Sequence, residues 1–392
     1  MKELPLCGQW IGKFYSTFPS PESPDSVFPG NATFNIECDR PNFGFACIDQ
    51  GNQIHGSRKD FSIKIEGSRI TGRAISTCAF DYDENQMIDV EESVQRLKDK
   101  IPNVFYLTDL VIENGTIDQN AIICEWSGIH QGKKIKGKFS GQKLRLDKSS
   151  PPNESMSWDK FKSFITKQIQ NGREFFFRGQ ASNKHGLNTT FHREYRFDLL
   201  RYDREACQKL TQLVNAISPH QYDKNKEFGP LLSLAQHHGF PTPLLDWSKS
   251  PYIAAFFALE SRPIDIAEDD NPRIYIFDSK AWRQNTTQVS HIADPRPTIT
   301  PLEFPAYNNP RHLPQQSVHT YTNIEDPEAW IRLVEKEKNK SYLTVIDIPR
   351  SEREFAMRDL AYMGVTAAAL FPGLDGICRS LKEEFFPPRN FT

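Results

Sequence analysis

Leu234-Ala235-Gln236-His237-His238-Gly239-Phe240-Pro241-Thr242-Pro243-Leu244-Leu245-Asp246-Trp247-Ser248 runs directly into an apolar segment, residues 251–259. A second stretch, Glu174-Phe175-Phe176-Phe177-Arg178-Gly179-Gln180, lies upstream of it. Each stretch places polar side chains at the end of a strongly apolar element. Charged groups are seldom placed beside core-forming runs unless something pairs with them. We therefore expect a ligand site where these two stretches meet.

The bulk properties of the chain indicate a globular protein of more than one domain. A chain of 392 residues is longer than a domain with a single hydrophobic core usually is. A composition of 38% hydrophobic and 25% charged residues is typical of soluble folds. The net charge of -2 is not the strongly basic charge that duplex-DNA binders usually carry. It does not exclude a local basic groove. No apolar run approaches the roughly 20 residues of a membrane span. Residues 1–5 lack the apolar core of a signal peptide, so a cytoplasmic location is predicted.

The seven cysteines are scattered along the chain. They form no Cys-x-x-Cys motif, and no histidine pair accompanies a cysteine pair at zinc-ligand spacing. The sequence therefore predicts reduced thiols and no metal site.

Residues 1–147 are predicted to form a β-rich domain, an antiparallel barrel or sandwich. Short segments rich in Ile, Val, Phe and Thr, several of them alternating apolar with polar residues, indicate its strands. These are residues 9–15, 32–38, 44–48, 61–66, 69–75, 121–127 and 134–139. Glu66-Gly67-Ser68 is typical of a hairpin turn, and residues 90–101 are predicted to be helical. Gly8-Gln9-Trp10-Ile11-Gly12 resembles the first strand of calycin-like barrels.

Residues 148–392 are predicted to form a mixed α/β domain after a polar, proline-bearing linker at residues 146–153. An overall α+β protein is expected. The predicted helices are residues 158–169, 204–217, 231–238, 251–259 and 350–363. The predicted strands are residues 175–177, 273–277, 343–348 and 365–371, and residues 302–320 contain a further strand entered from a proline-rich loop.

Arg178 follows three phenylalanines and precedes Gly179. A guanidinium at a strand end offers a bidentate fork to a phosphate or carboxylate, and glycine lets a ligand approach the backbone. The alternative is an internal ion pair, with Asp246 or Glu174 as the partner.

The segment from Gln236 to Gly239 ends a helix, where a histidine is also favoured by the helix dipole. Adjacent histidines on a helix point in different directions and cannot chelate one metal together. Ser250 followed by Pro251 is typical of a helix start, so Asp246 and Ser248 are not needed as caps. The helix that follows is apolar on all sides and should be buried, which would hold the preceding loop rigidly.

These motifs together resemble the FRG domain family, named for its Phe-Arg-Gly motif. The resemblance spans roughly residues 155–385. It rests on residues 177–180, Arg193, residues 235–239, 244–248, 254–258, 310–311, 315–316 and 370–376. The family usually has Arg where this chain has Pro243, and Thr where it has Ser248.

FRG domains are in turn similar to ADP-ribosyltransferases, and this implies NAD as a substrate. The resemblance implies NAD binding by Arg178, Gly179, Gln180, Gln236, Trp247, Ser248 and Arg311. It implies catalytic roles for His237 as a general base, Asp246 as a carboxylate that stabilises developing positive charge, and Gln315. Those enzymes usually carry a Glu on a later strand, and this chain has Gln315-Gln316 there.

Three functions are consistent with the sequence. The first is an ADP-ribosyltransferase that modifies a macromolecule, protein or nucleic acid, as bacterial toxin and phage-defence effectors do, with residues 1–147 as a sensing or targeting domain. The second is a binding module that recognises a nucleotide or a protein through an NAD-like cleft without catalysis. The third is a nucleotide or nucleic-acid hydrolase that uses a His/Asp pair.

Overall fold

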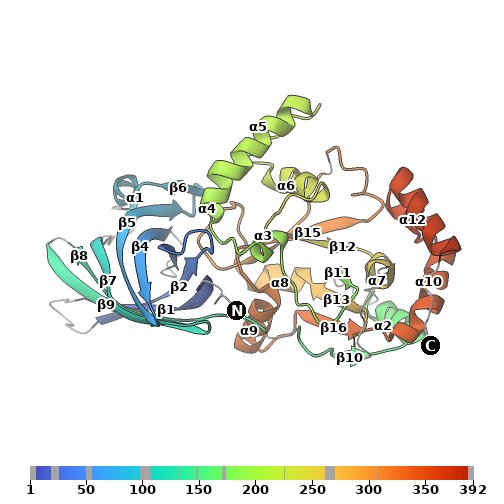
Figure 1. Ribbon diagram of the computed structural model, residues 1–392, viewed down its shortest axis with the longest axis horizontal. Coiled ribbons are helices and arrows are strands. Elements are labelled where there is room, and N and C mark those ends of the chain that lie inside the picture. Colours follow the sequence, from blue (N-terminus) through green and yellow to red (C-terminus); the bar gives the residue numbers. More distant parts are fainter. Residues whose placement is uncertain are drawn as a thin grey trace.

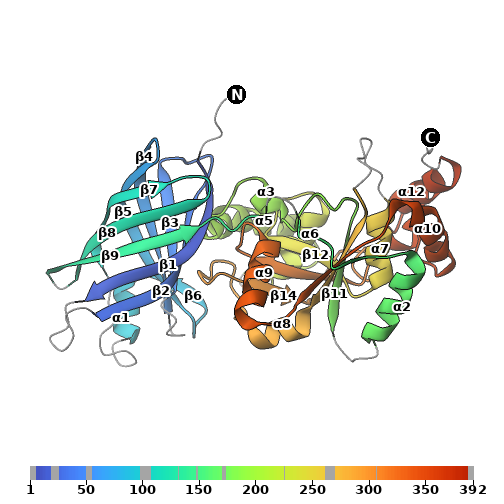
Figure 2. The ribbon, with the colours of Figure 1, turned by 90° about the horizontal axis from the view of Figure 1, so that it is seen from below.

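The computed structural model describes residues 6–18, 26–49, 55–97, 107–130, 132–146, 149–169, 174–224, 226–260, 270–305 and 307–386. The chain forms a β-barrel followed by a mixed sheet with helices on both faces, and the two parts lie side by side (Figures 1 and 2). Both predicted folds, the N-terminal barrel and the mixed α/β part, are confirmed.

The barrel is a closed antiparallel sheet of eight strands within the described residues, in the order β4-β3-β2-β1-β9-β8-β7-β5 and back to β4. Its strands are β1 (Gly8–Phe18), β2 (Ser26–Ile36), β3 (Phe43–Asp49), β4 (His55–Glu66), β5 (Arg69–Asp81), β7 (Thr108–Ile117), β8 (Ala121–His130) and β9 (Lys133–Gln142). The short strand β6 (Gln86–Ile88) extends the sheet beside β5, and helix α1 (Val90–Leu97) follows it.

Alternation along each strand explains the barrel, because every second side chain faces the interior. Trp10, Phe34 and Trp126 belong to its buried apolar core. The predicted hairpin is confirmed: Glu66 pairs with Arg69, and Gly67 has a φ of +61°. The sequence did not predict β7, because its Asn114-Gly115 pair is typical of a turn.

The second sheet has the strand order β10-β16-β13-β11-β12-β15-β14. Its strands are β10 (Glu154–Ser155), β11 (Phe175–Gln180), β12 (Leu244–Ser248), β13 (Arg273–Asp278), β14 (Ile299–Leu302), β15 (Ser317–Thr322) and β16 (Leu343–Asp347). Only the β10–β16 pair among these described strands is parallel.

Helices cover both faces of this sheet. One apolar core joins α2 (Trp158–Ile169), α7 (Pro251–Glu260), α10 (Arg353–Tyr362) and α11 (Ala367–Leu370) to one face. A second core joins α8 (Ser279–Asn285) and α9 (Pro327–Lys338) to the opposite face. The remaining helical elements are α3 (Thr190–Arg193), α4 (Leu199–Arg201), the π-helical turn η1 (Tyr202–Cys207), α5 (Gln208–Ile217), α6 (Phe228–His237), the 3₁₀ turn η2 (Arg350–Glu352) and α12 (Leu374–Phe385).

One expectation about the second part of the chain is wrong. Residues 365–371, predicted as a strand, contain helix α11: Thr366 caps it through its hydroxyl, which accepts from the Ala369 amide, and three consecutive alanines favour a helix. In the predicted linker, Ser149 and Ser150 are buried, and the guanidinium of Arg273 donates to both. Hydrogen bonds therefore hold that part of the linker against the sheet.

The prediction that all cysteines are reduced is also wrong, because Cys7 and Cys38 form a disulfide. The folded barrel brings their Cα atoms to 5.3 Å, although the two residues lie far apart in sequence. Cysteines 47, 78, 124, 207 and 378 are free thiols. Among the residues described, no helix has the length and apolar character needed to cross a membrane.

Charged groups join the barrel to the second part of the chain. Glu37 accepts hydrogen bonds from the backbone amides of Phe197 (2.9 Å) and Asp198 (3.0 Å). The Asp198 carboxylate in turn accepts from Arg58 (2.5 and 2.9 Å) and Arg40 (2.8 Å). Burial pushes the pKa of Asp198 up, but the two guanidinium groups outweigh it and hold the pKa at about 2.

Asp198→Asn tests this contact. The folded-state pKa lies below the ordinary 3.8, so the charge contributes stability, about 2 kcal/mol, that is present above pH 4 and lost as the pH falls through 2. We expect the variant to have a lower free energy of unfolding than wild type at pH 7 and the difference to shrink between pH 4 and pH 2. Urea denaturation across this range measures it. Glu337→Gln, at an exposed position of α9, is the control; a difference that is independent of pH would contradict the prediction.

Candidate functional site

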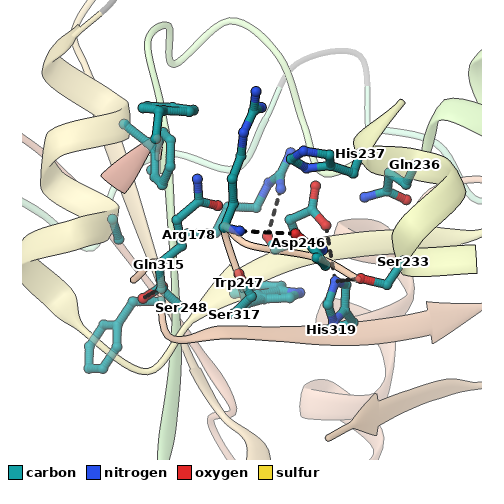
Figure 3. Close-up of a pocket in the computed structure, with 17 residues that line it drawn as sticks. Arg178, Ser233, Gln236, His237, Asp246, Trp247, Ser248, Gln315, Ser317 and His319 are labelled. Atoms are coloured by element: carbon teal, nitrogen blue, oxygen red, sulfur yellow. Dashed lines mark hydrogen bonds and ion pairs between the residues drawn. The ribbon is translucent and has the colours of Figure 1, made fainter. Parts of the chain in front are cut away.

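A polar cavity of about 420 Å³ opens beside β12, between α6 and α7 (Figure 3). The described residues that line it are Phe177, Arg178, Gly179, Ser233, Gln236, His237, Asp246, Trp247, Ser248, Ala254, Phe257, Asn309, Arg311, Gln315, Ser317, His319 and Phe371. All ten predicted site residues belong to this set except Gln180. The two sequence stretches do meet at one cavity.

The pleat of β12 decides which side chains face the cavity. Leu245 and Trp247 are buried in the core shared with α8 and α9, whereas Asp246 points the other way, and its side chain is 61% exposed. Successive residues of a strand face opposite sides of the sheet. Strand β12 therefore contributes side chains both to the hydrophobic core and to the cavity.

Arg178 fills the place where β11 and β12 separate. The two strands pair through a single position, Phe177 opposite Ser248. One step further along β11, the Arg178 guanidinium donates to the backbone carbonyl of Asp246 at 2.6 Å, while its Nε is buried without a partner. The predicted alternative, a direct ion pair with Glu174, is not formed, since Glu174 contacts Arg283 instead.

Asp246 is the only carboxylate among the described residues that line the cavity. Its Oδ1 lies 3.4 Å from Nε2 of His319, the residue opposite it on β15, and its side chain also hydrogen-bonds with Gln236. The cavity walls limit its solvation, which raises the pKa. The hydrogen bond from His319 and the charge of Arg178 outweigh this, so the pKa lies below its ordinary value of 3.8 and Asp246 is ionised at neutral pH.

His237 ends α6 and lines the cavity. Burial lowers its pKa from the ordinary 6.5, and the positive charge of Arg311 lowers it further. A neutral imidazole at neutral pH is able to accept a proton. Arg311 pairs with Asp375 at 3.1 Å and stacks over Phe371, with 5.1 Å from its Cζ to the ring centroid.

The Ser248 hydroxyl forms hydrogen bonds that hold the loop leading into α7. Its hydroxyl donates to the carbonyl of Gln315 at 2.8 Å and accepts from the amide of Ser250 at 3.0 Å. Ser250 caps α7 by accepting from Ile253, as predicted. The side-chain amide of Gln315 donates to the carbonyl of Leu370 at 3.1 Å. These bonds fix the wall between the cavity and α11.

Three residues predicted to bind a ligand make structural contacts instead. The Trp247 indole is buried on the far side of the strand, packs on Phe277 and donates to Thr320, so it cannot stack on a ligand in the cavity. The Gln180 amide donates to the carbonyl of His185, away from the cavity. Gly179 lies against α7, where a Cβ would come within 1.8 Å of the carbonyl oxygen of Ala254. Its lack of a side chain serves helix packing.

Sequence reasoning missed His319 and Ser233. The Ser233 hydroxyl lies 3.1 Å from Nε2 of His319, the same nitrogen that faces Asp246. A Ser-His-Asp triad needs the two partners on different ring nitrogens. Nδ1 of His319 is buried without a partner, so these three residues do not form a proton relay. The alternation of Ser317, His319 and Tyr321 within a strand is the signal that would have placed His319 on one face.

Gly179→Ala tests the packing role of the glycine. Forcing a methyl group against the backbone of α7 should lower the free energy of unfolding by about 1–3 kcal/mol or more. Urea denaturation measures this loss. Gly67→Asn is the control, because open space surrounds Gly67 and asparagine tolerates its positive φ. Wild-type stability in Gly179→Ala would contradict the assignment.

Comparisons with known proteins found a family model and a solved structure. The FRG domain model matches residues 173–265. The crystal structure of Rv2717c from M. tuberculosis is similar to 36% of this chain and 93% of that chain, with 10% sequence identity and a TM-score of 0.21. No curated protein matches the chain. The match to the family model contains β11, α6, β12 and α7, the elements that surround Asp246, so the part of the chain that forms the cavity is similar to FRG domains.

Proposed function

We propose that the cavity binds NAD as a substrate and transfers its ADP-ribose group to a macromolecular acceptor. The observation that carries this proposal is the ionised Asp246 carboxylate in a cavity whose other polar groups are cationic or neutral. A volume of about 420 Å³ lies within the range of small-molecule pockets, about 300–1,000 Å³.

The residues present suit a dinucleotide. Arg178 and Arg311 supply the positive charge that a pyrophosphate needs, and Nε of Arg178 is buried without a partner. Gln315 and Ser317 offer neutral polar groups of the kind that bind ribose hydroxyls or a carboxamide. Phe257 and Phe371 give the cavity an apolar side for a planar ring.

The chemistry of transfer uses the carboxylate. Cleaving a glycosidic bond develops positive charge on the sugar, and a fixed carboxylate stabilises that charge. His237, whose lowered pKa keeps it neutral, is available to accept a proton from the acceptor group. The barrel would then recognise the trigger or the target, as expected for a toxin or phage-defence effector.

A binding module without catalysis is the second candidate. The observation that favours it is Gln315, a neutral amide held by the Leu370 carbonyl at the position where related enzymes carry Glu. Hydrolysis by a His/Asp pair is less well supported, because the histidine that contacts Asp246 is His319, whose side chain is 4% exposed.

Asp246→Asn separates these candidates. Replacing the carboxylate with a neutral amide should lower NAD-dependent transfer by about 100- to 1,000-fold, because charge stabilisation is lost. NAD affinity should change by less than about tenfold, because the proposed phosphate contacts remain. Calorimetry measures binding, and radiolabelled NAD incubated with cell extract measures transfer to protein or nucleic acid.

Asp159→Asn is the matched control, since Asp159 lies on α2 with a side chain 72% exposed. Binding by wild type without transfer to any acceptor would favour the binding module. Absence of NAD binding by wild type would refute the proposal.

The pH dependence of transfer tests His237. A base acts in its neutral form, and the pKa of His237 lies below 6.5, so activity should persist below pH 6.5 and fall only as the pH passes through that lowered value. Arg311→Gln removes a positive charge, raises the pKa of His237 and should move this acid limb to higher pH.

A profile of kcat/KM against pH measures the shift. Arg379→Gln is the control, because Arg379 also stacks on Phe371 but does not line the cavity. An acid limb that stays in place in Arg311→Gln would show that His237 is not the titrating base.

A further inference from the structure

Gln236 has two ways to face Asp246, and they have opposite effects. An amide nitrogen donates hydrogen bonds, whereas an amide oxygen only accepts them. An ionised carboxylate also only accepts, so the Gln236 amide stabilises Asp246 only when its nitrogen points toward the carboxylate. Some neighbouring group must select that orientation.

Thr242 selects it. Thr242 is fully buried, and its hydroxyl donates to Oε1 of Gln236. The amide of Leu244 points at the same hydroxyl oxygen at 3.4 Å, which leaves the hydroxyl hydrogen for Gln236. With Oε1 occupied, the nitrogen of Gln236 faces Asp246, in agreement with the hydrogen bond between these two side chains.

Thr242 is itself held on both sides. Its amide donates to the hydroxyl of Thr190 at 2.9 Å, and its carbonyl accepts from the Phe191 amide at 3.2 Å. Pro241 and Pro243 restrict the backbone around it. The segment that carries Thr190 continues to Asp198, where the barrel holds it through Arg58.

We propose that Thr242 is a positioning residue that orients the Gln236 amide so that it donates to Asp246. The orientation rests on the hydrogen bond that Thr242 donates to Gln236, and only its effect on NAD binding rests on the proposed function. Asp246 is faced by Arg178 from β11, His319 from β15 and His237 from α6, and the hydrogen-bond partners of Thr242 in the described structure do not include these three.

Thr242→Val and Thr242→Ser test the proposal in the full chain. Valine keeps the shape and removes the hydroxyl, so the amide is no longer oriented and the pKa of Asp246 should rise toward its ordinary value. Serine keeps the hydroxyl and should keep the lowered pKa. A carbon-13 NMR titration of the Asp246 carboxyl group measures both. NAD binding should weaken by about 3- to 10-fold in Thr242→Val, the size expected for one lost hydrogen bond, and stay near wild type in Thr242→Ser.

A double-mutant cycle with Gln236→Leu makes the test specific. Thr242→Val should have no further effect on the Asp246 titration once the amide is absent. Equal shifts in the valine and serine variants, or additive shifts in the cycle, would overturn the proposal. If Thr242→Val does not fold, the wild-type protein still decides, because the side-chain amide signals of Gln236 should follow the titration of Asp246. Failure of wild type to bind NAD would refute the proposed function and leave this result standing.

Discussion

The cavity depends on the pleat of one five-residue strand, β12. Leu245 and Trp247 pack in the core, and burial of these two large apolar side chains determines that the face carrying Asp246 is turned toward the cavity. A shift of register by one residue would place Asp246 in that core and Trp247 in the cavity, at a cost no other contact could offset. The same constraint sets Asp246 opposite His319 on β15. The position of the carboxylate is therefore a consequence of hydrophobic packing.

The neighbouring strand supplies the opening. β11 and β12 pair at one position only, so the sheet separates beside Asp246, and the backbone carbonyl there needs another donor. Arg178 satisfies it. On the other side of β11, Gly179 lets α7 approach so closely that the helix backbone meets the strand. The Phe-Arg-Gly sequence thus has three structural roles. Phe177 packs in the core, Arg178 satisfies the carbonyl left unpaired where the strands separate, and Gly179 allows close contact with a helix.

Local sequence patterns predicted most of the helices and strands, because helix caps and strand alternation depend on residues that are close in sequence. They also predicted that the two polar stretches meet. They could not predict His319, which reaches Asp246 only through the pairing of β12 with β15. They also could not predict that Gly179 packs against α7 and that the Trp247 indole packs in the core, since a glycine or an aromatic residue beside a polar motif looks the same whether it faces a ligand or a helix. The strand predicted for residues 365–371 was wrong for a related reason, because a short apolar run is compatible with either a strand or a buried helix.

The contact that Arg178 makes determines what the cavity is able to attract. Had its guanidinium formed a bidentate pair with the Asp246 carboxylate, the two charges would have neutralised each other. It binds the backbone carbonyl instead, and the carboxylate is held through hydrogen bonds from Gln236 and His319. Two opposite charges therefore stay close together without being joined by a hydrogen bond. A ligand complementary to this arrangement carries a cationic and an anionic group at a short separation. The proposed substrate NAD carries both a pyridinium ring and a pyrophosphate, whereas a ligand of one charge sign would leave Arg178 or Asp246 uncompensated.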